Sequence, residues 1–327
     1  MKSSLENLFR VIGLSSRKLI LGSIFLFLLV LSACQQQPAV VTKQVEVEVE
    51  VEVTRIVQGE TITNTVLVTP TPAPADPLAR VREKGLYVAF AGEAPWSFIT
   101  PEGVFSGAEA EMCIECANKL GIKEVFPVTV AFDGLLPGLQ ARRYDVIVAG
   151  MSIRETRLEV AISTQLLYKY GTRVVGKKGD PRLKDLTSWT KVGKSGMKVA
   201  AIRGSTEIDD TKQFGVTMIE YPDNLAELAD LLAGRIELMG WNDNFFGAYM
   251  KANPDTPIEA VQTWDYEGVV SLPGHYFNSE DIALRDAYND CISELKTNGK
   301  MAEILTKWGF SPDTIPAAGP GYPPGAP

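Results

Sequence analysis

Between about residue 78 and residue 314 the chain alternates short apolar runs with amphipathic segments. The run LYVAF (86–90) precedes a segment with helical periodicity, Glu109–Leu120, and a second apolar run lies in VFPVTVAF (125–132). A further amphipathic segment, FDGLLPGLQARR, leads into the wholly apolar Val146–Ala149. Continuous apolar runs of this length, alternating with helical segments, predict buried parallel strands in α/β units. Ligands of such sheets bind at the carboxyl ends of the strands.

The same pattern begins again further along the chain. MKVAAIRGSTEIDD predicts a strand, a glycine turn and a helix start, and VTMIEYPDNLAELADLLAGRIELMGWND predicts strand, helix and strand. The sequence therefore predicts an α/β protein with two lobes. Amphipathic helices follow in 279–310, and the proline- and glycine-rich residues 314–327 predict a disordered tail.

The first 77 residues have a different pattern. Arg17-Lys18 precede the uncharged run LILGSIFLFLLVLSAC, which has the length of a signal peptide and is too short for a comfortable membrane span. Its end, Leu31-Ser32-Ala33-Cys34, resembles a bacterial lipobox, which implies a signal peptide over 1–33 and a lipid on Cys34. We expect the mature, lipid-anchored protein to lie at the outer face of the bacterial cytoplasmic membrane.

Residues 34–77 are expected to form a tether. The alternating stretch Val45–Val53 would suit a half-buried strand, but no neighbouring run is obviously built to pair with it. Repelling glutamates and the Thr-Pro repeats favour an extended spacer, with a small strand or an oligomerising stalk as the alternative.

Composition narrows the function. The 327 residues carry a formal net charge of −8, which argues against nucleic acid as a partner. His275 is the only histidine, so a metal site rich in histidine and a histidine-based triad are both excluded, and no cofactor is expected. Packing as a polar core residue is the interpretation favoured for His275.

Three cysteines remain besides Cys34. Cys113 and Cys116 lie three residues apart within one predicted helix, and Cys291 lies in another. The helix carries no second pair, so the C-x-x-C spacing favours small core residues over a redox or zinc motif. A disulfide from Cys291 to one of the other two stays open in an oxidising compartment.

Arg157 is the first candidate for chemistry. It follows the buried strand Val146–Ala149 and the loop Gly150–Ile153, where RETRLEVA can begin a helix. Backbone amides at a strand end, a helix N-terminus and a guanidinium together suit a carboxylate. A solvated helix charge paired with Glu155 or Glu159 is the alternative.

The order of these signals resembles family 3 of the extracellular solute-binding proteins, which serve ABC importers of polar amino acids and related solutes. The resemblance rests on FDGLLPGLQARRYDVIVAGMSIRETR, VAAIRGST, LLAGRIELMGWND and LRDAYNDCISELKTNGKMAEILTKWGF. It implies a lobe 1 of 78–173 and 275–313, a lobe 2 of 174–274, and hinge strands near Thr172–Val175 and Val269–Gly274. A ligand would close the two lobes, and a membrane permease would receive it.

The resemblance also implies the ligand contacts. Arg157 matches the arginine that binds the ligand carboxylate, and the other matching positions are Gly150, Ser152, Ser205 and Thr206. Where the family's amino-acid binders place an aspartate for the ammonium group, this chain has Asn242 followed by Asp243. Asn242 can accept a hydrogen bond from an ammonium but cannot neutralise it, so either Asp243 substitutes or the cation is bound elsewhere.

FAGEAPWSF indicates where else the cation could bind. Glu93, Trp96 and Phe132 follow strands of lobe 1, and a carboxylate with aromatic faces suits an alkylated or delocalised cation. These residues resemble the ectoine and hydroxyectoine branch of the family, although Ser152 stands where that branch has an aromatic. The ligand is therefore expected to be a small zwitterion, either a polar amino acid or an ectoine-like solute.

Two other functions stay open from the sequence. A cyclohexadienyl-dehydratase-like enzyme on the same fold would use Glu93 as a general acid. A sensory lipoprotein would have a cleft that binds no small molecule. The favoured interpretation is a binding protein without enzymatic activity.

Overall fold

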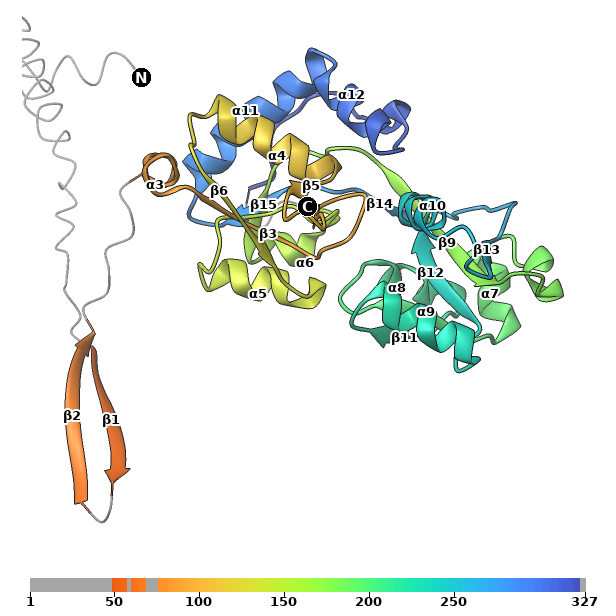
Figure 1. Ribbon diagram of the computed structural model, residues 1–327, viewed down its shortest axis with the longest axis horizontal. Coiled ribbons are helices and arrows are strands. Elements are labelled where there is room, and N and C mark those ends of the chain that lie inside the picture. The colour runs from red at the N-terminus through yellow and green to blue at the C-terminus, as the bar shows by residue number, and fades with distance from the viewer. Residues whose placement is uncertain (1–48, 58–59, 69–75, 324–327) are drawn as a thin grey trace, which may run out of the picture. The chain divides into compact units, whose positions relative to one another are not determined.

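The computed structural model describes residues 49–57, 60–68 and 76–323 (Figure 1). The chain divides into two units, Met1–Pro72 and Ala73–Pro327. The expected signal peptide, Cys34 and much of the expected tether lie outside the described residues. No helix among the described residues is long and apolar enough to span a membrane.

The first unit contains an antiparallel hairpin of β1 (Val49–Val57) and β2 (Glu60–Val68). This corrects the expectation of an unpaired extended spacer. The pairing partner of the Val-Glu repeat is ETITNTVLV, whose threonines and valines favour strand structure although the segment lacks strict alternation.

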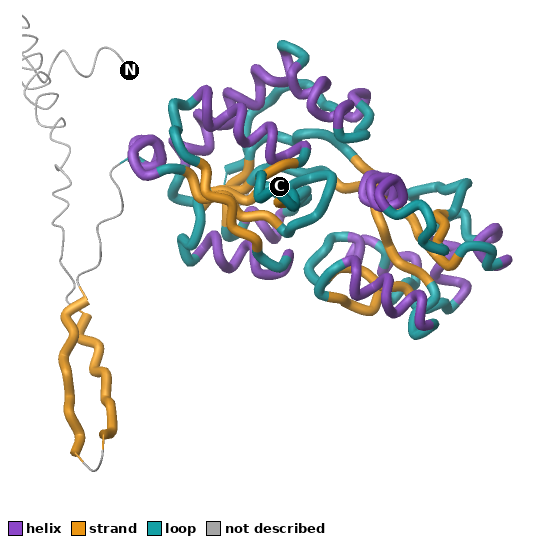
Figure 2. Tube along the Cα trace, in the orientation of Figure 1, coloured by secondary structure: helices purple, strands orange, loops and turns teal. Residues whose placement is uncertain are grey.

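The second unit is built on two separate sheets, which confirms the predicted two-lobed α/β fold (Figure 2). The first sheet has the strand order β6-β3-β7-β15-β8, and we call the part built on it lobe 1. β3 runs parallel to β6 and β7, and β15 runs antiparallel to β7 and β8. The strands are β3 (Leu86–Phe90), β6 (Val125–Thr129), β7 (Val146–Ile147), β8 (Ala161–Ser163) and β15 (Tyr276–Asn278).

Helices and a small hairpin complete lobe 1. The hairpin pairs β4 (Phe98–Ile99) with β5 (Phe105–Ser106). The helices are α3 (Pro77–Lys84), α4 (Ala108–Lys119), η1 (Phe132–Gly134), α5 (Leu135–Gln140), α6 (Glu155–Leu158), α11 (Ile282–Thr297), α12 (Lys300–Lys307) and η4 (Pro312–Thr314).

The second sheet has the strand order β11-β10-β12-β9-β13 and defines lobe 2. Its strands are β9 (Tyr170–Lys177), β10 (Val199–Ile202), β11 (Met218–Tyr221), β12 (Leu238–Asn242) and β13 (Ile258–Ala260). Its helices are η2 (Pro181–Asp185), α7 (Trp189–Ser195), α8 (Glu207–Asp210), η3 (Lys212–Phe214), α9 (Asn224–Ala233) and α10 (Asp243–Ala252). The Asp223 side chain caps α9 by accepting from Ala226 N–H, and Gly234 ends the helix in a left-handed conformation.

The chain passes between the two sheets twice. β9 leaves lobe 1 and enters lobe 2, and β14 (Val270–Ser271) leads back toward β15. The two strands pair antiparallel, with Val270 opposite Gly171 and Ser271 opposite Tyr170. The connection between the lobes is therefore a two-stranded ribbon.

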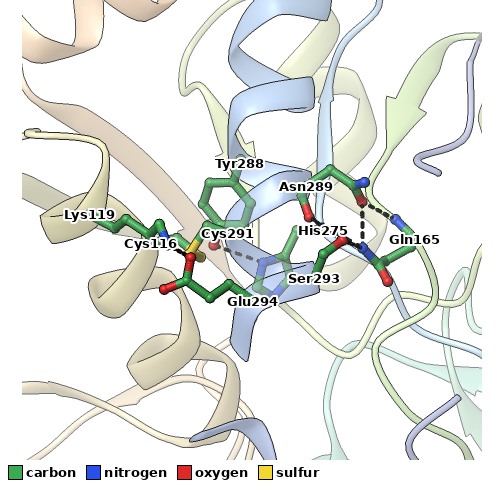
Figure 3. The surroundings of a disulfide bond; sticks show 9 residues. All are labelled: Cys116, Lys119, Gln165, His275, Tyr288, Asn289, Cys291, Ser293 and Glu294. Atoms are coloured by element: carbon green, nitrogen blue, oxygen red, sulfur yellow. Dashed lines mark hydrogen bonds and ion pairs between the residues drawn. A yellow bond between two sulfur atoms is a disulfide. The ribbon is translucent and has the colours of Figure 1, made fainter. Parts of the chain in front are cut away.

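A disulfide joins two helices of lobe 1 (Figure 3). Cys116 on α4 is bonded to Cys291 on α11, while Cys113 is a buried free cysteine. Both bonded cysteines are buried, so the disulfide belongs to the core that α4 and α11 share. The question that the sequence left open is thus resolved in favour of a Cys116–Cys291 pair.

The tail corrects a second expectation, because residues 314–323 are not disordered. Tyr322 pairs with Ser163 at the free edge of β8, through Tyr322 N–H to Ser163 O (2.8 Å) and Ser163 N–H to Tyr322 O (3.1 Å). Gly319 N–H donates to Gln165 Oε1 (2.9 Å), and Asn289 Nδ2 donates to Gly319 O (3.1 Å). Proline and glycine prevent a regular strand here, but they do not prevent these backbone contacts.

Candidate ligand-binding cleft

A small cleft lies between the lobes. It contains nine of the ten residues that the sequence nominated for ligand binding: Glu93, Trp96, Phe132, Gly150, Ser152, Arg157, Ser205, Thr206 and Asn242. The remaining lining residues were not anticipated from the sequence: Ala149, Tyr170, Thr172, Ile202, Glu207 and Ser271.

Arg157 lies on the short helix α6 and is 8% exposed, so it is not a solvated surface charge. Its Nη1 donates to Ser152 O (2.7 Å) and its Nη2 donates to Gly204 O of lobe 2 (2.9 Å). Its guanidinium carbon lies 5.8 Å from the centre of the Phe132 ring. Burial lowers the pKa of Arg157, because desolvation disfavours the charged guanidinium, and an anion bound beside it would favour the charged form again.

The turn after β7 brings Gly150 against Trp96. Gly150 has φ +62°, and a Cβ at this position would lie 2.9 Å from Trp96 Nε1. Both the backbone conformation and the space therefore require glycine. Trp96 is 3% exposed and packs against Tyr170, with 5.5 Å between ring centres, so it belongs to both the core and the cleft wall.

Ser152 serves mainly to fix this turn to the ribbon between the lobes. Its Oγ accepts from Leu272 N–H (3.2 Å), and its carbonyl accepts from Tyr276 O–H (2.7 Å) as well as from Arg157. The side chain is almost fully buried. Ser152 therefore contributes little free polar surface to a ligand.

Two glutamates face the cleft from opposite lobes. Glu93 Oε1 accepts from Asn224 Nδ2 of lobe 2 (2.8 Å), and burial, with further contributions from Glu207 and Asp223, raises the pKa of Glu93 to about 8. Burial also raises the pKa of Glu207. Glu207 was missed because GSTEIDD was interpreted only as a turn and helix start; its place directly after Ser205-Thr206 was the available signal.

Lobe 2 contributes a turn in which Gly204 has φ +79° and is followed by Ser205 and Thr206. Ser205 Oγ is buried and has no hydrogen-bond partner among residues 76–323. A hydroxyl in this position can donate to or accept from a bound solute.

Asn242 and Asp243 differ in their positions relative to the cleft. Asn242 lines the cleft and also caps α10, because its Oδ1 accepts from Phe245 N–H (2.7 Å). Asp243 is the one nominated residue that does not line the cleft: its carboxylate pairs with Arg173 and accepts from Tyr266 O–H. The start of α10 at Asp243 turns this side chain toward β9.

Three other aromatic side chains that could have bordered the cleft are core residues. Tyr168 and Trp241 are almost fully buried, and Phe245 packs against Trp241. The aromatic residue that the sequence did not single out is Tyr170, at the first position of β9. Among the described residues no group of three histidine, cysteine, aspartate or glutamate side chains is arranged to hold a metal ion.

The lobes contact each other around the cleft. Besides Arg157–Gly204 and Asn224–Glu93, Arg154 of lobe 1 pairs with Asp210 of lobe 2. Arg203 Nη1 of lobe 2 lies 3.5 Å from Asp133 Oδ2 of lobe 1. A cleft with charged and aromatic lining residues, between two α/β lobes that touch across it, is typical of a two-lobed ligand-binding protein.

Comparisons with known proteins agree with this class. Residues 86–311 match the model of the bacterial extracellular solute-binding proteins, family 3, and the chain belongs to this family. A probable amino-acid ABC transporter periplasmic-binding protein of Sinorhizobium fredii is 29% identical over 73% of this chain and 82% of its own length. The lysine/arginine/ornithine-binding periplasmic protein of Escherichia coli is 25% identical over 66% of this chain and 83% of its own length.

Among solved structures, EhuB in complex with hydroxyectoine superimposes with a TM-score of 0.66 and is 28% identical. The match covers 72% of this chain and 93% of that one. These relatives are binding proteins, which agrees with the prediction of a solute-binding protein.

Proposed function

We propose that the protein is the substrate-binding lipoprotein of an ABC importer and captures a small zwitterionic solute between its lobes. The expected lipid on Cys34 and the segment up to residue 77 would hold the lobes near a permease in the cytoplasmic membrane. The named relatives that serve ABC transport support the partner, and the expected lipobox supports the anchor.

The observation that carries the proposal is the charge distribution in the cleft. Arg157 is the one arginine or lysine among the lining residues described, and it has three N–H donors left after its two backbone contacts. Glu93 and Glu207 supply two carboxyl groups. A ligand that carries both a carboxylate and a cationic group satisfies both sets, whereas a neutral or purely anionic ligand offers the two carboxyl groups no opposite charge.

The aromatic lining favours a broad or delocalised cation. Trp96 and Tyr170 are neighbours, and Phe132 lies beside Arg157. Tyr170 supplies an aromatic face in a cleft where Ser152 stands in place of the aromatic residue of the ectoine branch. Aromatic faces next to carboxyl groups suit a guanidinium or a cyclic amidinium, so L-arginine and hydroxyectoine, named among the relatives' ligands, are the first probes to use.

The test is a thermal-shift screen of the purified protein against amino acids, betaines and ectoines. A ligand present at 100 times its Kd stabilises the folded state by about 2.7 kcal/mol. We expect L-arginine or hydroxyectoine to raise the Tm. Arg157→Ala should raise the Kd of the solute about 100-fold, because the buried carboxylate of the solute loses its charge partner. Arg143→Ala, which removes an exposed arginine of the same lobe, is the matched control.

Two results would contradict the proposal. A screen in which no zwitterion raises the Tm would favour a sensory lipoprotein with an unused cleft. Affinity that survives Arg157→Ala within about threefold would show that the carboxylate binds elsewhere.

A further inference from the structure

The backbone of Gly150 is held from two sides. Its N–H donates to Glu109 Oε2 (2.8 Å), and its carbonyl accepts from Tyr170 O–H (2.8 Å). Gly150 lines the cleft and lies against the Trp96 indole. The two peptide groups that flank the Gly150 Cα are therefore each fixed by one side chain, and Glu109 is not itself among the residues that line the cleft.

Glu109 lies in the first turn of α4 and is fully buried. Both of its oxygens have partners: Oε2 accepts from Gly150 and Oε1 accepts from Tyr168 O–H (2.7 Å). A buried carboxyl group is costly unless it is hydrogen-bonded, so its partners indicate what it is there to hold. Both partners lead to the cleft wall, because Tyr168 packs beside Tyr170, with 6.2 Å between ring centres.

His275 lies behind Glu109. Its Nε2 is 3.5 Å from Glu109 Oε2, and its Nδ1 is hydrogen-bonded to Tyr288 O–H of α11 (2.9 Å; Figure 3). The His275 backbone also bonds Thr164 in both directions, at the start of the segment that leads into β9. The only histidine of the chain thus bonds α11 and Thr164, and its Nε2 lies beside the Glu109 carboxyl group without a hydrogen bond to it.

We propose that Glu109 is a positioning residue for solute binding, which presets the Gly150 backbone and is itself held in place by Tyr168. The inference rests on the proposed function for its effect on affinity. It assigns to the buried polar cluster a role in the cleft and not only in the stability of lobe 1.

The physical reason is preorganisation. A turn with a left-handed glycine has many alternative conformations, and a ligand that must order it loses binding free energy. Removal of the Glu109 acceptors frees the Gly150 N–H. The ligand must then order the Gly150 turn when it binds, and this ordering lowers the binding free energy. The expected result is a Kd that rises about tenfold, the equivalent of about one buried hydrogen bond.

Asp145 offers a matched control in the same lobe. It is also a buried carboxyl group that accepts a backbone N–H, from Tyr87 (2.9 Å), but it lies before β7, at the end of the sheet away from the cleft. We expect Glu109→Ala and Asp145→Ala both to lower the Tm. Only Glu109→Ala should raise the Kd for L-arginine or hydroxyectoine about tenfold, and Glu109→Gln, which keeps one acceptor oxygen, should recover most of the affinity.

A second measurement needs no ligand and covers a failure of Glu109→Ala to fold. In the NMR spectrum of the full-length protein, the Gly150 amide proton should be shifted and exchange somewhat faster in Glu109→Gln, because a neutral amide oxygen is a weaker acceptor than a carboxylate. It should stay unchanged in Asp145→Asn. Equal changes in Kd and in Gly150 exchange for the two positions would overturn the proposal. If the wild-type protein binds neither probe, the proposed function fails on that point, while the Gly150 amide still decides the role of Glu109.

Discussion

The two lobes present different kinds of surface to the cleft. Lobe 1 contributes side chains that are themselves fixed from behind: Arg157 is buried, Trp96 is wedged against Gly150, and Gly150 is bonded to Glu109. Lobe 2 contributes the 204–206 turn, in which Ser205 Oγ has no partner among the described residues, and the four-residue helix α8.

This difference indicates a division of roles. A preset surface loses little freedom when a ligand arrives, so lobe 1 is suited to recognise the solute first. On the proposed function, the contacts from lobe 2 would then be made as the lobes close, and their additional binding free energy would shift the equilibrium toward the closed form. The predictions below weaken one lobe or one contact between the lobes at a time.

The largest effect is expected from the disulfide of lobe 1. Replacement of both Cys116 and Cys291 by alanine should lower the free energy of unfolding by about 2–5 kcal/mol, because the unfolded chain is no longer cross-linked across a long loop. Urea denaturation followed by circular dichroism measures this loss. Cys113→Ala, one helical turn away, is the control and should cost less; an equal loss would show that packing, and not the cross-link, is responsible.

The second prediction concerns the acid of lobe 1. The pKa of Glu93 is raised to about 8, so below that pH the side chain is mostly protonated and a cationic ligand must displace the proton. We expect the affinity for L-arginine to rise by up to about tenfold per pH unit toward pH 8 and then to level off, as measured by calorimetry. Glu93→Gln should flatten this profile, and a profile unchanged by Glu93→Gln would place the cation elsewhere.

The same shift has a consequence for the unliganded protein. Since the pKa of Glu93 is higher in the folded protein than in the unfolded chain, the folded state binds the additional proton, and its stabilising contribution is lost as the pH rises through about 8. The Tm without ligand should therefore be higher at pH 5.5 than at pH 8. The difference should be smaller in Glu93→Gln.

The third prediction removes the tail from lobe 1. A stop after Thr314 deletes the backbone pairing of Tyr322 with Ser163 and the Gly319 contacts. These hydrogen bonds are partly exposed, so we expect a loss of about 1–3 kcal/mol in the free energy of unfolding and little change in Kd. Urea titration of the variant measures the free energy of unfolding, and ligand titration measures the Kd. No change in the free energy of unfolding would mean that the tail contacts are dispensable.

The fold class could be predicted from the sequence because buried parallel strands produce continuous apolar runs, such as Val146–Ala149, and because polar residues gather after them. The same rule located most of the cleft. It failed where the direction of a side chain depends on how a helix begins: Asp243 opens α10 and points to Arg173, whereas Glu207 opens α8 and faces the cleft.

Pairings between distant segments were the other limit. The choice of Cys116 over Cys113 depends on how α4 is rotated against α11, which periodicity alone does not fix. The β1–β2 pairing and the docking of Tyr322 on β8 likewise depend on partners that carry no strong pattern of their own. Such contacts follow from the assembled fold, not from local sequence.

The smallest effect is expected from the ion pair between Arg154 of lobe 1 and Asp210 of lobe 2. Both side chains are partly exposed, about a third and a quarter, so solvent screens the pair and its contribution is about 0.2–1 kcal/mol. Because the pair joins the lobes without lining the cleft, its loss should act on the closed form and not on ligand contacts.

Asp210→Asn should therefore raise the dissociation rate of L-arginine by about two- to fivefold in stopped-flow measurements and leave the association rate nearly unchanged. Asp209→Asn, which removes the neighbouring acid paired within lobe 2 to Lys212, is the control. A slower association with an unchanged dissociation rate would mean that Asp210 guides the solute into the cleft, and the assignment of recognition to lobe 1 alone would then need revision.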